Sequence, residues 1–87
     1  MNNVVLRKIV VTTAWQPLSA NKLVASVTIS TPPTNAGTVL FRTTSEPAHE
    51  VPWVSGEFHD FKRVNLAQIE VKGTADGDLV SLVGGTW

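Results

Sequence analysis

The sequence lacks cysteine and tyrosine and contains a single methionine among its 87 residues. Without cysteine, no disulfide can brace the fold and no thiolate can bind a metal. Basic and acidic residues number seven each, so the chain lacks the positive excess typical of nucleic-acid binding. The apolar runs are too short to cross a bilayer, and the first one ends at Arg7 and Lys8. We therefore expect neither a membrane helix nor a signal peptide.

The small size of the chain limits its stability. Surface scaling predicts that folding buries roughly 8,600 Å². That burial contributes on the order of 130 kcal/mol, against about 130 kcal/mol of ordering entropy. Small domains in this position usually gain stability from disulfides, a structural metal or partner subunits. Since cysteine is absent, we expect one domain over residues 1–87 that self-associates.

β-Branched residues dominate the composition. Valine, isoleucine and threonine make up 26 of the 87 residues, and such side chains favour the half-buried surface of a sheet. The cleanest alternation runs over residues 23–30, where every odd position is apolar and the even ones are Ser or Thr apart from Val24. Further strands are predicted at residues 4–12, 38–43, 51–54, 58–63 and 79–83, and alternating apolar positions continue at residues 64–66 and 69–71.

Turns and irregular segments are predicted between these strands. Pro17 predicts an irregular crossing over residues 14–19 because it has no amide proton for a ladder. The apolar period slips by one residue across Ala67 and Gln68, which predicts a turn or bulge, with a short helix over residues 65–70 as the alternative. No crossover is long enough for parallel strands. We expect an all-β chain of seven or eight strands, forming a small antiparallel β-sandwich or jelly-roll-like domain.

The residues that carry catalytic chemistry are scarce. With two histidines, no cysteine and no glycine-rich phosphate loop, an enzyme is not expected. Glu57 and His59 would share one face of a strand and, with His49 and Glu50, could hold a transition metal. The simpler interpretation places both histidines at the surface beside solvated acids, with no metal or cofactor. The Asp76-Gly77-Asp78 run lacks the full set of calcium ligands and predicts a hairpin turn.

The three tryptophans and the uneven charge distribution point to contacts between molecules. We predict Trp15, Trp53 and Trp87 as buried interface anchors. For Trp87 the alternative is docking against its own sandwich, and aromatic side chains near polar loops could also stack on sugars. Residues 1–42 contain four basic residues and no acid, whereas residues 43–87 contain three basic and seven acidic residues. Such a split can orient copies against one another, unless folding interleaves the two halves. The predicted rim charges are Arg7, Lys8 and Arg42.

Six segments in a fixed order resemble small β-sandwich proteins of tailed-phage virions. The resemblance extends over roughly residues 17–83. The loop over residues 44–54 departs from it, because that loop carries bulky and charged residues where the family has a smaller, glycine-rich connection. The matching segments are PLSA (17–20), VTI (27–29), NAGTV (35–39), SGE (55–57), LAQIEVKG (66–73) and GDLV (77–80).

This resemblance implies a non-enzymatic virion component. It implies a capsid decoration or cement protein on the capsid exterior, often trimeric, whose partners are its own copies and the major capsid protein. Similar domains occur at the neck, the tail and the bases of fibres, so these locations are the alternatives. A glycan-binding β-sandwich module is the alternative from another functional class. No nucleic acid or membrane partner is expected.

Overall fold

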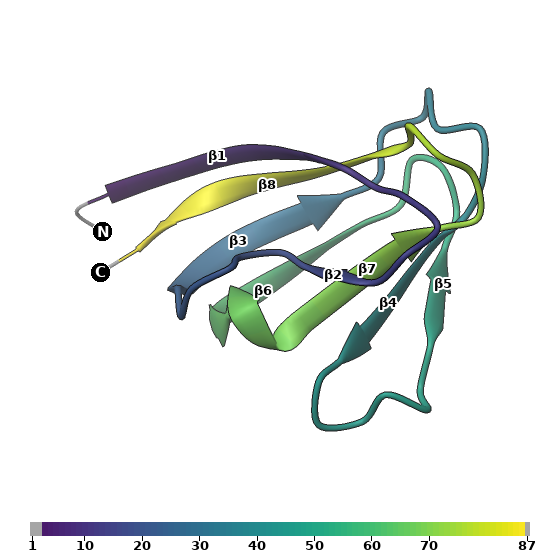
Figure 1. Cartoon of the computed structure of the whole chain (residues 1–87). Helices are drawn as coiled ribbons and strands as arrows, with labels where there is room; N and C mark the ends of the chain where they lie inside the picture. Colours follow the sequence, from purple (N-terminus) through teal and green to yellow (C-terminus); the bar gives the residue numbers. More distant parts are fainter. Residues whose placement is uncertain (1–2, 87) are drawn as a thin grey trace.

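The computed structural model describes residues 3–86, which form two four-stranded antiparallel sheets packed face to face (Figure 1). The prediction of an all-β antiparallel sandwich is confirmed. In the first sheet the strand order is β1 (Asn3–Val10), β8 (Leu79–Thr86), β3 (Val24–Ser30) and β6 (Phe58–Asn65). In the second sheet the strand order is β2 (Gln16–Pro17), β7 (Ile69–Gly73), β4 (Val39–Thr43) and β5 (Val51–Trp53).

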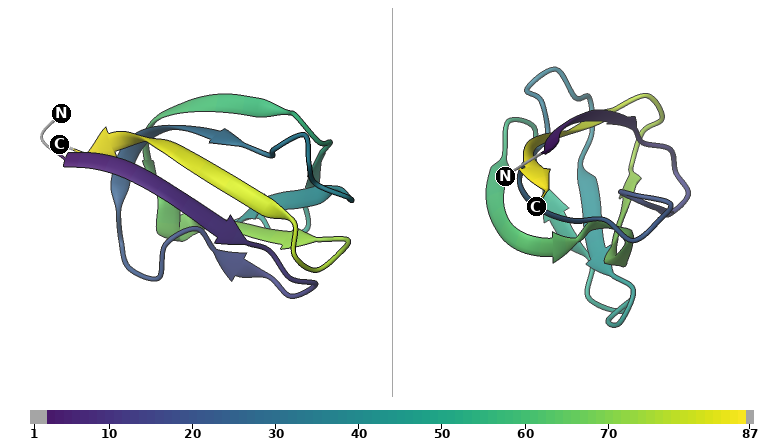
Figure 2. Two further views of the ribbon diagram at one scale, coloured as in Figure 1. Left: turned by 90° about the horizontal axis from the view of Figure 1, so that it is seen from above. Right: turned by 90° about the vertical axis from the view of Figure 1, so that its left-hand side faces the viewer.

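Period-two alternation decides which side chains form the core. Along β3 the odd positions Ala25, Val27 and Ile29 are at most 3% exposed, as the alternation predicted. The same period buries Val39 and Phe41 on β4, so the two sheets meet through their apolar faces and surround a common interior (Figure 2). The core residues are Val5, Val11, Leu18, Ala25, Val27, Ile29, Val39, Phe41, Trp53, Leu66, Val71, Val80 and Leu82.

A turn is present at residues 76–78 as predicted, but it is not a hairpin, because it joins β7 of the second sheet to β8 of the first, and it is tied to a distant loop. Gly77 has a φ of +92°, a conformation that L side chains rarely adopt. The buried carboxylate of Asp78 accepts hydrogen bonds from the amides of Ala36 and Gly37, both at 2.8 Å. The Asn35 side chain bonds the backbone of Leu79 through both its oxygen and its nitrogen. These bonds hold the loop over residues 31–38 against the start of β8.

The predicted slip of period near residue 67 is a single 3-10 turn, Leu66–Gln68. The Asn65 side chain caps it by accepting from the amide of Ala67 at 3.1 Å, and it also accepts from the amide of Leu23 at 3.2 Å. The bulge lies earlier, on β6, where Arg63 has a φ of +53° and its amide donates to Ser26 Oγ. Within residues 3–86 no helix is long and apolar enough to span a membrane.

Two strands extend beyond their predicted limits. The irregular crossing contains β2, which lies at the edge of the second sheet. Its Pro17 pairs with Glu70, and because the outer side of an edge strand has no neighbour, the missing amide proton of proline costs no ladder hydrogen bond. Strand β8 continues past the predicted end at residue 83 to Thr86. It does so because Gly84 and Gly85 pair with β1 on one side and β3 on the other. A side chain at Gly84 would overlap the carbonyl oxygen of Ser26 and lie 2.7 Å from Val27 Cα.

Substitution of Gly84 should therefore disturb the centre of the first sheet. We expect Gly84→Ala to lower the free energy of unfolding by about 2–3 kcal/mol, because the new methyl group meets backbone rather than a movable side chain. Urea unfolding followed by circular dichroism measures the loss. The control is Val24→Ala at an exposed position on β3, with an expected change of about 0.5 kcal/mol or less. Equal effects of the two substitutions would contradict this account.

Candidate functional site

The sandwich is open along the side where β5 and β6 end their respective sheets. A hollow of about 660 Å³ lies there, between β4 and β5 on one wall and β6 on the other. Its apolar lining consists of Phe41, Val51, Trp53, Phe61, Val64 and Ile69. Its volume and apolar character are those of a site that takes a small ligand or the side chain of a partner.

An aromatic cluster forms the floor of the hollow. The ring of Trp53 stacks on Phe41 with 3.8 Å between centroids, and it lies parallel to Phe61 at 6.5 Å. The edge of His59 approaches the same indole at 4.8 Å. Trp53 is only 5% exposed, so its contacts are within the chain itself rather than with a partner. His59 and Phe61 lie two residues apart on β6, so both face the interior, opposite Ile29 and Val27 of β3.

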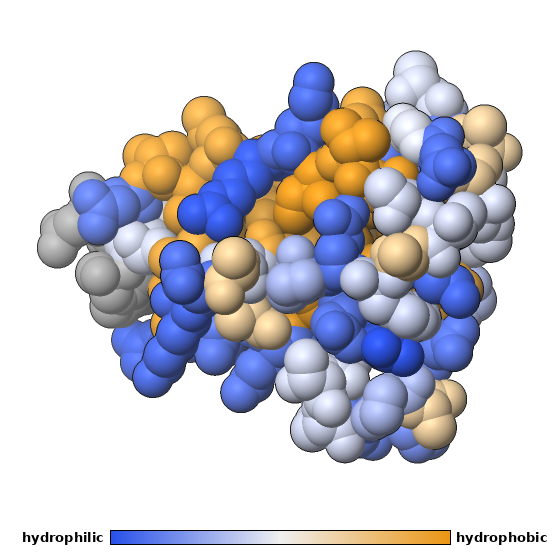
Figure 3. Space-filling view, viewed as in Figure 1, coloured by the Kyte–Doolittle hydropathy of each residue, from blue (hydrophilic) through white to orange (hydrophobic). Residues whose placement is uncertain are grey.

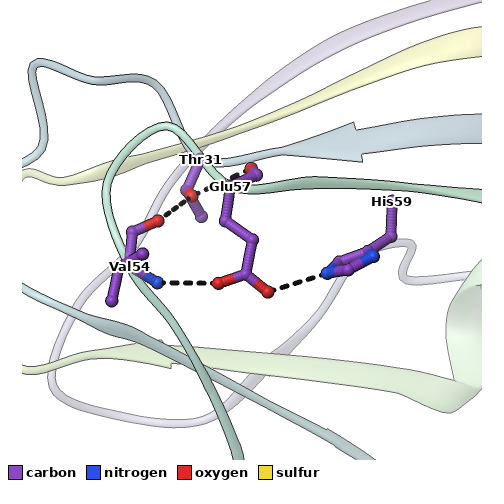
Figure 4. Close-up of polar contacts among 4 residues, drawn as sticks. All are labelled: Thr31, Val54, Glu57 and His59. Atoms are coloured by element: carbon purple, nitrogen blue, oxygen red, sulfur yellow. Dashed lines mark hydrogen bonds and ion pairs between the residues drawn. The ribbon is translucent and has the colours of Figure 1, made fainter.

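Glu57 is hydrogen-bonded to His59, a lining residue of the hollow, as their shared strand face predicted (Figure 4). The Glu57 carboxylate accepts from His59 Nε2 at 2.7 Å and from the Val54 amide at 3.1 Å. These two hydrogen bonds, that of His59 first, hold the pKa of Glu57 below its ordinary value of 4.5. The buried Thr31 hydroxyl donates to the carbonyls of Val54 and Glu57, which fixes the turn that carries the pair.

Arg42 joins the hollow to the outer face of the second sheet. Its Nε donates to Glu70 at 2.8 Å across the β4–β7 ladder, and its guanidinium lies 4.0 Å from the ring centroid of Trp15. Lys72 approaches the same indole at 5.3 Å. Trp15 is half-buried beneath these cations. Both Trp15 and Arg42 therefore have intramolecular partners, which the sequence alone did not indicate.

The two histidines share the hollow but do not form a metal site. His49 lies 3.8 Å from Glu46 on the exposed loop, and His59 is paired with Glu57. Over residues 3–86 no group of three His, Cys, Asp or Glu side chains converges closely enough to hold a metal ion. The metal alternative is therefore not supported by the geometry of the described residues.

A second candidate surface lies on the outer face of the first sheet. Four apolar side chains form it: Val4 (78% exposed), Leu6 (69%), Val10 (53%) and, directly opposite Leu6 on the neighbouring strand, Val83 (54%). We call this set the β1–β8 face, and Figure 3 shows hydrophobic surface where these strands run. The predicted rim residues Arg7 and Lys8 are exposed on β1. Trp87, the third predicted anchor, lies outside the described residues.

The Glu57–His59 pair predicts a defined dependence of stability on pH. Because the pKa of Glu57 is lower in the folded chain, its ionised form stabilises the fold above about pH 4.5. That contribution is lost as the pH falls through the lowered pKa. Glu57→Gln should thus lose less stability than the wild type between about pH 5 and pH 3 in urea unfolding. Glu50→Gln, on the exposed loop, is the control, and identical acid limbs for Glu57→Gln and the wild type would contradict the prediction.

The chain was compared with known protein families, curated proteins and solved structures. No protein-family model, no curated protein and no solved structure matches the chain. The assignment of function therefore rests on the residues and surfaces described above.

Proposed function

We propose that this chain is a structural assembly module, a capsid decoration protein of a tailed-phage virion that acts through subunit contacts rather than through chemistry. The virion assignment comes from the resemblance of the segments within residues 17–83 and from the sandwich architecture that the resemblance implied. A position at the neck, the tail or a fibre base is the alternative within the same class. The assembly role itself is supported by a feature of the described surface.

The β1–β8 face is the observation that carries the proposal. Its four apolar side chains are each more than half exposed. Three of them lie on β1, where Lys8 separates Leu6 from Val10, and Val83 lies beside Leu6 on β8. Strand β1 is also the edge of its sheet, so it has a strand neighbour on one side only. Exposed apolar surface next to an open edge favours association, because burial removes the side chains from water and pairs the free backbone groups.

The glycan-binding alternative finds less support in the aromatic side chains. Stacking on a sugar needs an indole face that is open to solvent. Of the two described tryptophans, Trp53 is packed between Phe41 and Phe61, and Trp15 carries the guanidinium of Arg42 on its ring. Titration with host polysaccharides, followed by tryptophan emission, tests this alternative directly. A saturable change in emission would support it over the assembly role.

Charge on the β1–β8 face should prevent association. We expect the wild-type chain to sediment as an oligomer at micromolar concentration and Leu6→Lys to raise the dissociation constant at least tenfold, about 1.4 kcal/mol. The matched control is Ala14→Lys, since Ala14 is exposed on the loop between β1 and β2, outside this face. Its self-association should equal that of the wild type. A monomeric wild type, or equal effects of the two lysines, would overturn the assembly role.

The copy number in purified virions distinguishes the locations. Quantitative mass spectrometry should find hundreds of copies per particle for a decoration protein, because such proteins follow the capsid lattice. A dozen copies or fewer would place the chain at the neck, tail or fibre base. Its absence from virions would contradict the virion assignment.

A further inference from the structure

The first sheet has two long free edges of equal length. Strands β1 and β6 each contain eight residues and end the sheet on opposite sides. On β1, the Val10 carbonyl accepts from Gln16 Nε2 at 2.8 Å. The rest of its outer edge has no strand partner among residues 3–86. Free edges of this length are normally covered or protected, because they template the addition of another strand.

Strand directions make the two edges complementary. Every neighbouring pair in the order β1-β8-β3-β6 is antiparallel, so β1 and β6 run in opposite directions. A second copy in the same orientation beside the first would therefore place its β1 antiparallel to β6. Antiparallel addition continues the same hydrogen-bond pattern across the boundary between copies. The contact is head to tail, since two different edges meet.

Exposed apolar side chains lie at both edges on the same face of the sheet. Phe58, at the start of β6, is 65% exposed. It pairs with Ser30, which in turn pairs with Ser81 on β8. Thr28, two residues before Ser30 on β3, pairs with Val83, so Phe58 faces the same way as the β1–β8 face. Joining the edges would bring Phe58 beside Leu6 of the next copy and remove both side chains from water.

The basic residues of β1 can pair with carboxylates that lie beside the hollow near the start of β6. Strand β1 carries Arg7 and Lys8 and no acid. Arg7 pairs with the fully buried Leu82, so it lies on the inner side of the sheet, yet it is exposed and makes no ion pair within the described part of the chain. An inward charge on an edge strand resists unspecific strand addition. The inward charge is compatible with a partner strand that places carboxylates next to Arg7.

The hollow beside β6 supplies such carboxylates. Glu46 lines it, and Glu57 is hydrogen-bonded to His59 of the lining, whereas the Asp60 carboxylate accepts from Thr28 on the outer face of the sheet. The basic group in the same lining, Arg42, is already paired with Glu70. Glu46 and Glu57 therefore place negative charge beside the hollow, whereas the basic residues of β6, Lys62 and Arg63, lie toward the other end of that strand. That negative charge suits the basic, acid-free β1 of a second copy.

From these observations we infer that β1 of a second copy adds antiparallel to the free edge of β6, next to the hollow. Val4 and Leu6 of the added strand then lie beside Phe58, and its Arg7 reaches the carboxylates at the hollow. The inference rests on the proposed assembly function and names the two surfaces through which copies join. Repetition of the contact extends the first sheet from copy to copy and closes into a ring where the rotation between copies permits.

Disulfide trapping tests this contact, because the natural chain contains no cysteine. Leu6→Cys protein is mixed with Phe58→Cys protein or, in parallel, with Asp60→Cys protein under mild oxidation. Directly opposed positions on paired strands bring Cβ atoms within disulfide range. We expect one of these mixtures to form the mixed disulfide at least tenfold faster than the control, Leu6→Cys with the exposed loop variant Ala14→Cys. Predominant Leu6–Leu6 disulfides, or mixed disulfides at the control rate, would overturn the inference.

Charge reversal gives a second measurement on cysteine-free protein. Arg7→Glu should weaken self-association about tenfold in sedimentation, whereas Lys22→Glu, at an exposed position outside both edges, should not change it. Equal effects of the two would contradict the edge contact. If the wild type associates but copies do not join through β1 and β6, this inference fails and the proposed function stands. If the wild type remains monomeric, both fail.

Discussion

The fold depends on the close approach of β3 and β8 at the centre of the first sheet. Their inward side chains, among them Ile29 and Leu82, are fully buried against the second sheet. No disulfide reinforces this layer, so burial of one apolar face on each sheet holds the two together. Gly84 permits the approach, since any side chain there would meet the backbone of β3. The order of the outer strands follows from this central pair.

The open side of the sandwich is a consequence of unequal strand lengths. Strand β5 has three residues and β6 has eight, so the second sheet cannot cover the first along that side. Aromatic rings fill part of the gap, with Trp53 as the largest. The remaining space is the hollow. The same mismatch leaves the edge of β6 accessible, beside a hollow whose lining includes Glu46 from the loop before β5.

Local patterns in the sequence predicted the strands but not their partners. The alternation over residues 23–30 identified both β3 and its buried face, and the shared parity of Glu57 and His59 predicted their contact. Pairing order depends on contacts between residues far apart in sequence, which periodicity does not encode. The continuation of β8 through Gly84 and Gly85 was missed for the same reason, because glycine is unfavourable in a strand until two neighbours leave no space for a side chain.

The candidate surfaces were predictable only in part. The sequence predicts the tryptophans as anchors between molecules, but Trp53 fills the open side of its own sandwich. That position depends on how far apart the two sheets lie, which the sequence does not show. Strand β1 has apolar residues at both odd and even positions, so parity could not tell its inner from its outer face. Its pairing with β8 resolves the ambiguity by setting Leu6 opposite Val83.

The two sheets differ in their capacity to grow. The second sheet ends in β2 and β5, which have two and three residues, and each contains a proline, Pro17 and Pro52. Such short strands, each with one amide proton missing, can form very few backbone hydrogen bonds with an added strand. Growth is therefore confined to one layer. In a filament or ring of these molecules, the first sheet would be continuous from copy to copy. The second sheet of each copy would remain separate from those of its neighbours.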